Sequence, residues 1–134
     1  MDTKNWYLRL LKPSWAPPEW LFGPVWSILY VIIFFSFARI FYGVYTKEVA
    51  WLIALPFLLN LIFNFSYTPI QFGLRNNLLA SIDIILILTT LIWALFSTWQ
   101  ALPGLHWVVY ANIPYLLWVI FATILQINIT YLNK

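Results

Sequence analysis

The sequence predicts an all-α integral membrane protein, an antiparallel helical bundle with four transmembrane helices. Hydrophobic residues make up 63% of the 134 residues and charged residues only 8%, and the mean hydropathy is +0.85. Ordinary soluble domains carry about 25% charged residues. With so few charged side chains, most of the surface must face lipid instead of water. The lipid bilayer is therefore the first expected partner, and residues 1–134 form one domain.

Composition also excludes several kinds of site. The chain has no cysteine and a single histidine, His106, which excludes disulfides, thiolate metal ligands and a multi-histidine metal centre. No metal and no cofactor are expected. The net charge of +3 comes from scattered cations, so nucleic acid is not an expected partner. Paired carboxylates, a glycine-rich phosphate loop and a Ser/His/Asp set are all absent from the sequence, which leaves hydrolysis without machinery.

Four apolar stretches are long enough to cross a bilayer, which takes about 20 residues. We expect a Pro- and Trp-rich loop over residues 1–19 and helices over about 20–42, 50–68, 78–99 and 106–131. These apolar runs are continuous and do not alternate, so they do not fit barrel strands. The connections are short and contain Gly or Pro, which makes successive helices antiparallel neighbours.

The cations predict the orientation in the membrane. Five of them fall on one side of the four helices: Lys4, Arg9, Lys12, Arg75 and Lys134. Lys47 falls on the other side, and so does Arg39, whose side chain we expect to snorkel to the interface. The positive-inside rule then places both termini in the cytoplasm. A bacterial or archaeal inner membrane is the expected location.

Aromatic and amide side chains within the spans have two interpretations. Trp26, Trp93 and Trp118 lie deep, where an indole N–H needs a partner on another helix or on a ligand. Asn60 and Asn64 share one face of the second span, and their carboxamides either join helices or, at Asn64 in particular, contact a ligand. The sequence leaves both interpretations open.

Three further features carry weaker signals. Asp83, one turn into the third span, either pairs or caps the helix, with Arg75 as a candidate partner, or serves a ligand or proton. The proline-rich stretch 12–26 is a lid or a membrane-surface anchor. The stretch from Leu125 through Tyr131 to Lys134 matches a proposed cholesterol pattern that is frequent by chance, so a sterol is a secondary ligand expectation.

Blocks of residues in order along nearly the whole chain resemble the tryptophan-rich sensory protein / translocator protein family (TspO, or peripheral benzodiazepine receptor). They are Trp6-Tyr7, KPSWAPPEW over 12–20, FGPVWSILY over 22–30, the pair Asn60 and Asn64, LLASID over 78–83, and PYLLWVIFAT over 114–123. The family has five transmembrane helices, and this chain begins at the loop that follows the first. After the last block the family usually has Leu-Asn, whereas this chain has Leu125-Gln126.

The resemblance implies binding of flat hydrophobic ligands, above all porphyrins such as protoporphyrin IX, and in some members sterols. It also implies a role in tetrapyrrole or stress regulation. Carried over by position, the pocket residues are Tyr7, Pro17, Trp26, Tyr30, Phe63, Asn64, Tyr67, Trp118 and Ala122. A homodimer is expected. Because this chain begins after the family's first helix, one wall of the family's pocket has no counterpart in it.

The residues themselves favour the same ligand class, since stacked rings suit the faces of a porphyrin and amides suit its edges. Three alternatives remain. The cavity could degrade porphyrin in the light, using Trp26 and Trp118. The chain could be a small proton-coupled transporter subunit, for which Asp83 is the candidate group. It could also be a structural membrane subunit whose polar residues only join helices.

Overall fold

The protein is an elongated bundle of helices, seen here in a computed structural model that describes residues 13–16, 19–70, 74 and 76–133. The order is a 3-10 turn η1 (Glu19–Leu21), α2 (Phe22–Tyr45), α3 (Trp51–Thr68), α4 (Asn77–Ala101), a 3-10 turn η3 (Pro103–Leu105), α5 (His106–Ala111) and α6 (Ile113–Leu132). The part of the chain described contains helices and no strand. The all-helical bundle predicted from the sequence is confirmed.

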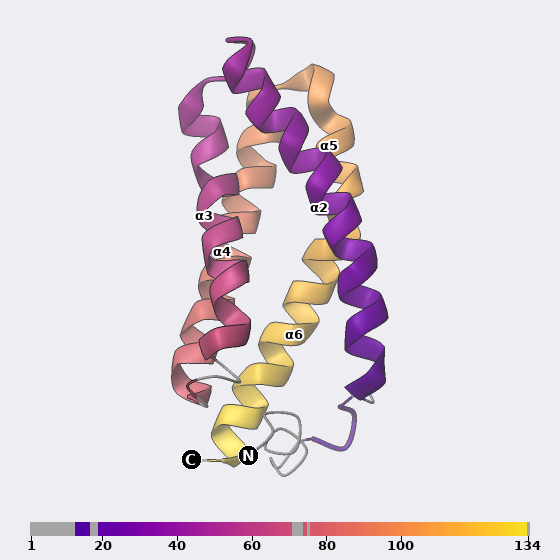
Figure 1. Cartoon of the computed structure of the whole chain (residues 1–134), viewed down its shortest axis with the longest axis vertical. Helices are drawn as coiled ribbons and strands as arrows, with labels where there is room; N and C mark the ends of the chain where they lie inside the picture. The colour runs from indigo at the N-terminus through magenta and orange to yellow at the C-terminus, as the bar shows by residue number, and fades with distance from the viewer. Residues whose placement is uncertain (1–12, 17–18, 71–73, 75, 134) are drawn as a thin grey trace.

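The successive spans α2, α3, α4 and the pair α5–α6 run antiparallel because the connections between them are short. Five residues join α2 to α3, and Lys47 within them has a φ of 67° that closes the turn. At the start of α4, the side chain of Asn76 accepts a hydrogen bond from the amide of Leu79 at 3.0 Å, an N-cap that satisfies one of the free amides of the first turn. As a result, the start of α2 and the end of α6 lie at the same end of the bundle (Figure 1).

The expected single helix over 106–131 is divided in two at Asn112. Pro114, in the first turn of α6, has no amide hydrogen and its ring clashes with a carbonyl one turn earlier, so a straight helix cannot continue through it. The side chain of Asn112 stabilises the break, since its amide donates to Val108 O at 2.8 Å and to Ser36 Oγ at 2.9 Å. The second of these bonds ties the break to α2.

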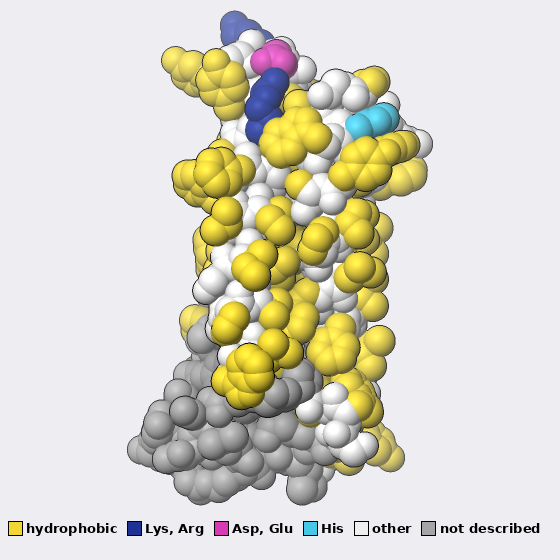
Figure 2. Space-filling model, turned by 90° about the vertical axis from the view of Figure 1, so that its right-hand side faces the viewer, with side chains coloured by type: hydrophobic (Ala, Val, Ile, Leu, Met, Phe, Trp, Pro, Cys, Tyr) yellow, Lys and Arg dark blue, Asp and Glu magenta, His cyan; other side chains and the backbone are white. Residues whose placement is uncertain are grey.

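The bundle is of a size and polarity that suit a membrane. α2, α4 and α6 are each long and apolar enough to cross it, and α3 is a shorter apolar helix. Large apolar side chains cover the outer faces, Phe34, Phe65 and Phe96 among them. On the face seen in Figure 2, hydrophobic side chains cover the middle and the visible charged ones gather at one end. Such a distribution indicates an integral membrane protein.

The interior is packed around α4, which contacts α3, α5 and α6. Ile40, Phe57, Leu91 and Val108 are fully buried. Phe37 and Phe57 meet edge to face between α2 and α3, with ring centroids 4.8 Å apart. This tight packing does not extend along the whole of α2, and the space it leaves near the start of that helix is the candidate site.

Candidate ligand-binding cavity

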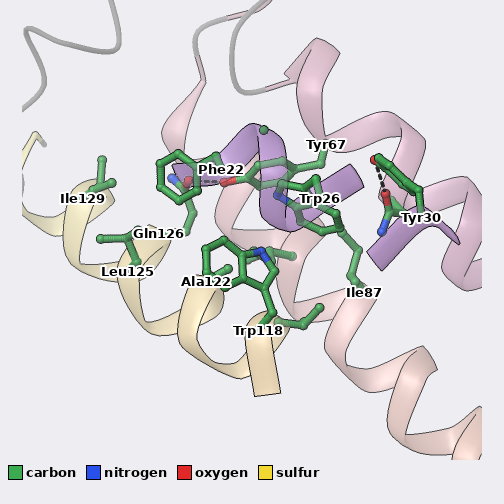
Figure 3. A pocket seen from close by; sticks show the side chains of 14 residues that line it. Phe22, Trp26, Tyr30, Tyr67, Ile87, Trp118, Ala122, Leu125, Gln126 and Ile129 are labelled. Atoms are coloured by element: carbon green, nitrogen blue, oxygen red, sulfur yellow. Dashed lines mark hydrogen bonds between the residues drawn. The ribbon is translucent and has the colours of Figure 1, made fainter. Parts of the chain in front are cut away.

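A cavity of about 360 Å³ lies between the first half of α2, the C-terminal end of α3, the first half of α4 and the stretch of α6 from Trp118 to Ile129. Figure 3 shows the lining side chains converging from these helices. Its volume falls within the range of small-molecule sites, about 300–1,000 Å³. The lining is largely aromatic and aliphatic, with a few amide and hydroxyl groups.

Aromatic rings form one wall of the cavity. The ring centroids of Trp26 on α2 and Trp118 on α6 are 6.5 Å apart, and the two ring planes are nearly perpendicular, at 88°. The Phe22 ring lies edge-on to Trp118 with the centroids 5.8 Å apart, and the Tyr30 ring lies beside Trp26 with the centroids 5.5 Å apart. Because Phe22, Trp26 and Tyr30 are spaced by four residues, one helical face presents all three rings. Two helices thus supply a continuous aromatic surface.

The indole nitrogen of Trp118 is buried and has no hydrogen-bond partner within the described part of the chain. Buried donors in folded proteins are nearly always paired. The Trp118 ring lines the cavity, whereas its Nε1 is itself buried, so a ligand acceptor could pair with it only if the ring turned.

A polar network begins at two residues of the cavity lining, Tyr30 and Asn64. The Tyr30 hydroxyl donates to Asn64 Oδ1 at 3.1 Å, and Asn64 Nδ2 donates to the Tyr115 hydroxyl at 2.8 Å. Tyr115 in turn donates to Asn60 Oδ1 at 2.8 Å, and Asn60 Nδ2 donates to the carbonyl of Ile87 on α4 at 2.9 Å. Asn60 therefore joins helices, whereas Asn64 both joins helices and lines the cavity.

A second polar pair lies one turn further along α3. The hydroxyl of Tyr67 donates to Gln126 Oε1 on α6 at 2.5 Å, and both side chains line the cavity. Figure 3 shows this bond beside Phe22. The cavity thus has polar groups at two levels, with the indoles of Trp26 and Trp118 among its apolar walls.

The structure brings together most of the residues that the sequence pointed to. Lining the cavity are Trp26, Tyr30, Asn64, Tyr67, Trp118 and Ala122. Phe63 is not among the described lining residues and packs instead against the hydrophobic core. Tyr7 and Pro17 lie outside the described residues. Ligand contact at all nine positions stays a prediction.

Other lining residues were not identified from the sequence: Phe22, Gly23, Ile84, Ile87, Val119, Leu125, Gln126 and Ile129. Helical spacing was the signal that could have found several of them. From Trp118, the lining positions on α6 continue through Ala122 and Leu125 to Ile129, a 4-3-4 pattern that keeps one face. Ile84 and Ile87 on α4 could not be found this way, because only the packing shows which face of an apolar helix meets the cavity.

The acidic residue of the spans is not part of the described cavity lining. Asp83 is 5% exposed, and one of its carboxylate oxygens has no hydrogen-bond partner in the described structure. Asn76, and not Asp83, caps α4, so the capping interpretation is wrong. The suggested partner Arg75 lies outside the described residues.

Arg39 and Glu48 meet at the opposite end of the bundle. Arg39 Nη2 lies 3.0 Å from Glu48 Oε2, and the guanidinium lies 5.7 Å from the centre of the Tyr42 ring. The expected snorkelling of Arg39 to the interface thus ends in an ion pair with the α2–α3 connection.

Membrane-spanning helices around an aromatic and amide-lined cavity define an integral membrane protein of the binder or sensor class. Comparison with known proteins gives the family: a model of the TspO/MBR family matches residues 1–132. The chain belongs to the TspO/MBR family. This confirms the resemblance seen in the sequence.

Relatives from distant organisms agree with this assignment. Tryptophan-rich protein TspO of Bacillus cereus is 38% identical over 97% of this chain and 82% of its own length. Protein CrtK of Rhodobacter capsulatus is 35% identical, over 96% of this chain and 78% of its own length. The human translocator protein is 33% identical, over 81% of this chain and 69% of its own length.

Proposed function

We propose that this protein binds flat hydrophobic ligands within the membrane, with porphyrins such as protoporphyrin IX as the leading class, and serves in tetrapyrrole or stress regulation. The observation that carries the proposal is the pair of nearly perpendicular indoles, Trp26 and Trp118, which line the same cavity. A flat ring system can lie against one indole and meet the edge of the other.

Porphyrin titration of the detergent-solubilised protein tests the proposal. We expect the Soret absorbance of protoporphyrin IX to shift on binding at micromolar protein, and the shift to be lost when Trp26→Phe is combined with Trp118→Phe. The matched control is Trp93→Phe, since Trp93 is 43% exposed on α4 and is not among the described lining residues. An unchanged shift in the double variant would remove the indoles from the site.

Light-dependent degradation of porphyrin is the second candidate. It is favoured by the short separation of the two indole centroids, 6.5 Å, because a photoexcited porphyrin lying against one indole would have a second oxidisable ring close by. In the presence of oxygen we expect bound porphyrin to lose absorbance under illumination and not in darkness. Equal loss in the double indole variant would indicate bleaching without the protein.

The other expectations receive less support. The cholesterol pattern does not form one surface, since Leu125 is 4% exposed and lines the cavity whereas Tyr131 is 67% exposed. A proton-coupled transporter would need an ionisable group at the cavity, and Asp83 is not among the described lining residues. Because the cholesterol pattern is divided between the cavity and the outer surface, sterol binding stays a secondary proposal.

We also propose a homodimer in a bacterial or archaeal inner membrane with both termini in the cytoplasm. The apolar outer faces of α2 and α3 support burial in lipid or against a second copy. Mass measurement of the protein in native nanodiscs would give the oligomeric state. Labelling of single cysteines introduced at residues 47 and 133, at opposite ends of the bundle, would give the orientation.

A further inference from the structure

The carboxamide of Gln126 is a polar group of the cavity to which neither the family assignment nor the proposed function gives a role. Its side chain is 2% exposed and lies on the cavity wall, in the second half of α6. Burying an amide in a membrane interior is costly unless it is hydrogen-bonded. The hydrogen-bond partners of Gln126 therefore indicate its role.

A chain of hydrogen bonds fixes the orientation of this carboxamide. Gln126 Oε1 accepts from the Tyr67 hydroxyl at 2.5 Å, and Gln126 Nε2 donates to Thr130 Oγ1 at 3.2 Å. The Thr130 hydroxyl donates its only proton to the carbonyl of Asn77 at 2.9 Å. Ser81 Oγ lies 2.6 Å from Thr130 Oγ1, so Ser81 must be the donor in that contact. Thr130 can then only accept from Gln126, which prevents the amide from flipping.

The oriented carboxamide keeps unused hydrogen-bonding capacity. A glutamine side chain has two N–H donors and an oxygen that accepts two bonds. The contacts of the described residues use one donor and one acceptor position of Gln126. One donor and one acceptor position are therefore left for a molecule in the cavity.

The charge of the lining restricts which group can bind there. The lining residues that the structure describes include aromatic, aliphatic, Asn and Gln side chains and none that is charged. An ionised group moved from water into such surroundings would lose its hydration without a countercharge. A neutral hydrogen-bonding group loses much less and can be paired fully.

From this geometry we propose that Gln126 and Tyr67 form a recognition subsite for an uncharged hydrogen-bonding group on the edge of the ligand. Hydroxyls, ester or amide carbonyls and protonated carboxyls share the required chemistry. Thr130 is the positioning residue, because it holds the amide without lining the cavity. The inference rests on the proposed function, the binding of flat hydrophobic molecules in this cavity, and specifies how their edges are selected.

Two matched ligand pairs test the subsite on the full chain in nanodiscs. One pair is mesoporphyrin IX dimethyl ester and etioporphyrin, which both carry methyl and ethyl groups and differ in the two propionate ester groups of the first. The other is 1-hydroxypyrene and pyrene, which differ by one hydroxyl. A hydrogen bond is worth about 0.5–1.5 kcal/mol net, so Gln126→Met should weaken the binding of the ester and of 1-hydroxypyrene by roughly 2- to 12-fold. Affinity for etioporphyrin and pyrene should change less than about twofold.

Other variants separate recognition from packing. Tyr67→Phe and Thr130→Val should reduce the same preference, and Thr130→Ser should restore it, because serine keeps the hydroxyl. Asn128→Met is the matched control, since the Asn128 amide bonds the carbonyl of Ile124 on its own helix and is not among the described lining residues. Retained pyrene binding shows that each variant is folded.

The outcomes are distinct for the subsite and for the function on which it rests. Wild-type protein without preference within either pair, or variants that weaken both members of a pair equally, would overturn the subsite. If the porphyrins do not bind while 1-hydroxypyrene keeps its Gln126-dependent advantage, the subsite stands and the porphyrin assignment fails. Absence of binding by all four probes overturns both.

Discussion

The hydroxyl of Tyr115 donates a hydrogen bond to Oδ1 of Asn60 at 2.8 Å, with both side chains fully buried. Tyr115 lies in the first turn of α6, and Asn60 lies in the middle of α3. The same hydroxyl accepts from Asn64 at 2.8 Å. A single oxygen thus joins two helices and supports Asn64, which lines the cavity.

Replacing Tyr115 with Phe should destabilise the bundle. Interhelical hydrogen bonds in membrane proteins contribute about 0.6 kcal/mol on average and about 1.7 at most. Tyr115→Phe breaks two and leaves two buried amide atoms unpaired, so we expect a loss of about 1–3 kcal/mol in the free energy of unfolding. Unfolding in mixed micelles measures it. Tyr110→Phe, at a site 64% exposed, should change stability little, and equal effects of the two variants would contradict the role of the network.

Gly43 should not tolerate a larger residue. A Cβ added there would overlap Val49 Cγ2, at the point where the α2–α3 connection crosses the end of α2. Because Val49 is 3% exposed, it has little room to move, and Gly43→Ala should cost about 1–3 kcal/mol of stability. Combining it with Val49→Ala should recover part of the loss. Gly104→Ala is the control, since nothing lies within 4 Å of a Cβ there, and a similar cost at Gly104 would refute the steric explanation.

Filling the cavity should block ligand binding without unfolding the protein. Ala122 lines the cavity one turn after Trp118, so the ring of Ala122→Phe would occupy space that the ligand needs. We expect porphyrin affinity to fall about tenfold or more, while the thermal unfolding temperature stays close to that of the wild type. Ala101→Phe, at the exposed end of α4, should bind normally. Unimpaired binding by Ala122→Phe would place the ligand elsewhere.

The Glu48 carboxyl should titrate below its ordinary range. Its hydrogen bonds from Arg39 and Thr46, and the charge of Arg39, lower its pKa from the usual value near 4.5. A lowered folded-state pKa means that the contact stabilises the fold above pH 4.5, and that this contribution is lost as the pH falls through the lower folded-state value. Carboxyl NMR should show the Glu48 pKa rising in Arg39→Gln. Because Glu48 is exposed, overall stability should change little, and an unshifted pKa in the variant would contradict the pairing.

Sequence patterns predicted the helices of this protein because long apolar runs have few alternatives in a membrane. A span such as Asn77–Ala101 must satisfy its backbone hydrogen bonds internally, so its length and composition predict a helix. The exception is the last span, where Pro114 forces a break whose position at Asn112 depends on hydrogen bonds to Ser36, far away in the chain.

The chain by itself determined its helices and its membrane environment, since these follow from local composition and from the length of its apolar runs. Tertiary structure alone decided which apolar faces enclose the cavity and which polar groups become partners. Gln126 looks in the sequence like any amide near the end of a span. Only when α3 and α6 pack beside each other does it meet Tyr67, because hydrogen bonds between helices depend on distances and angles that no spacing within one helix contains.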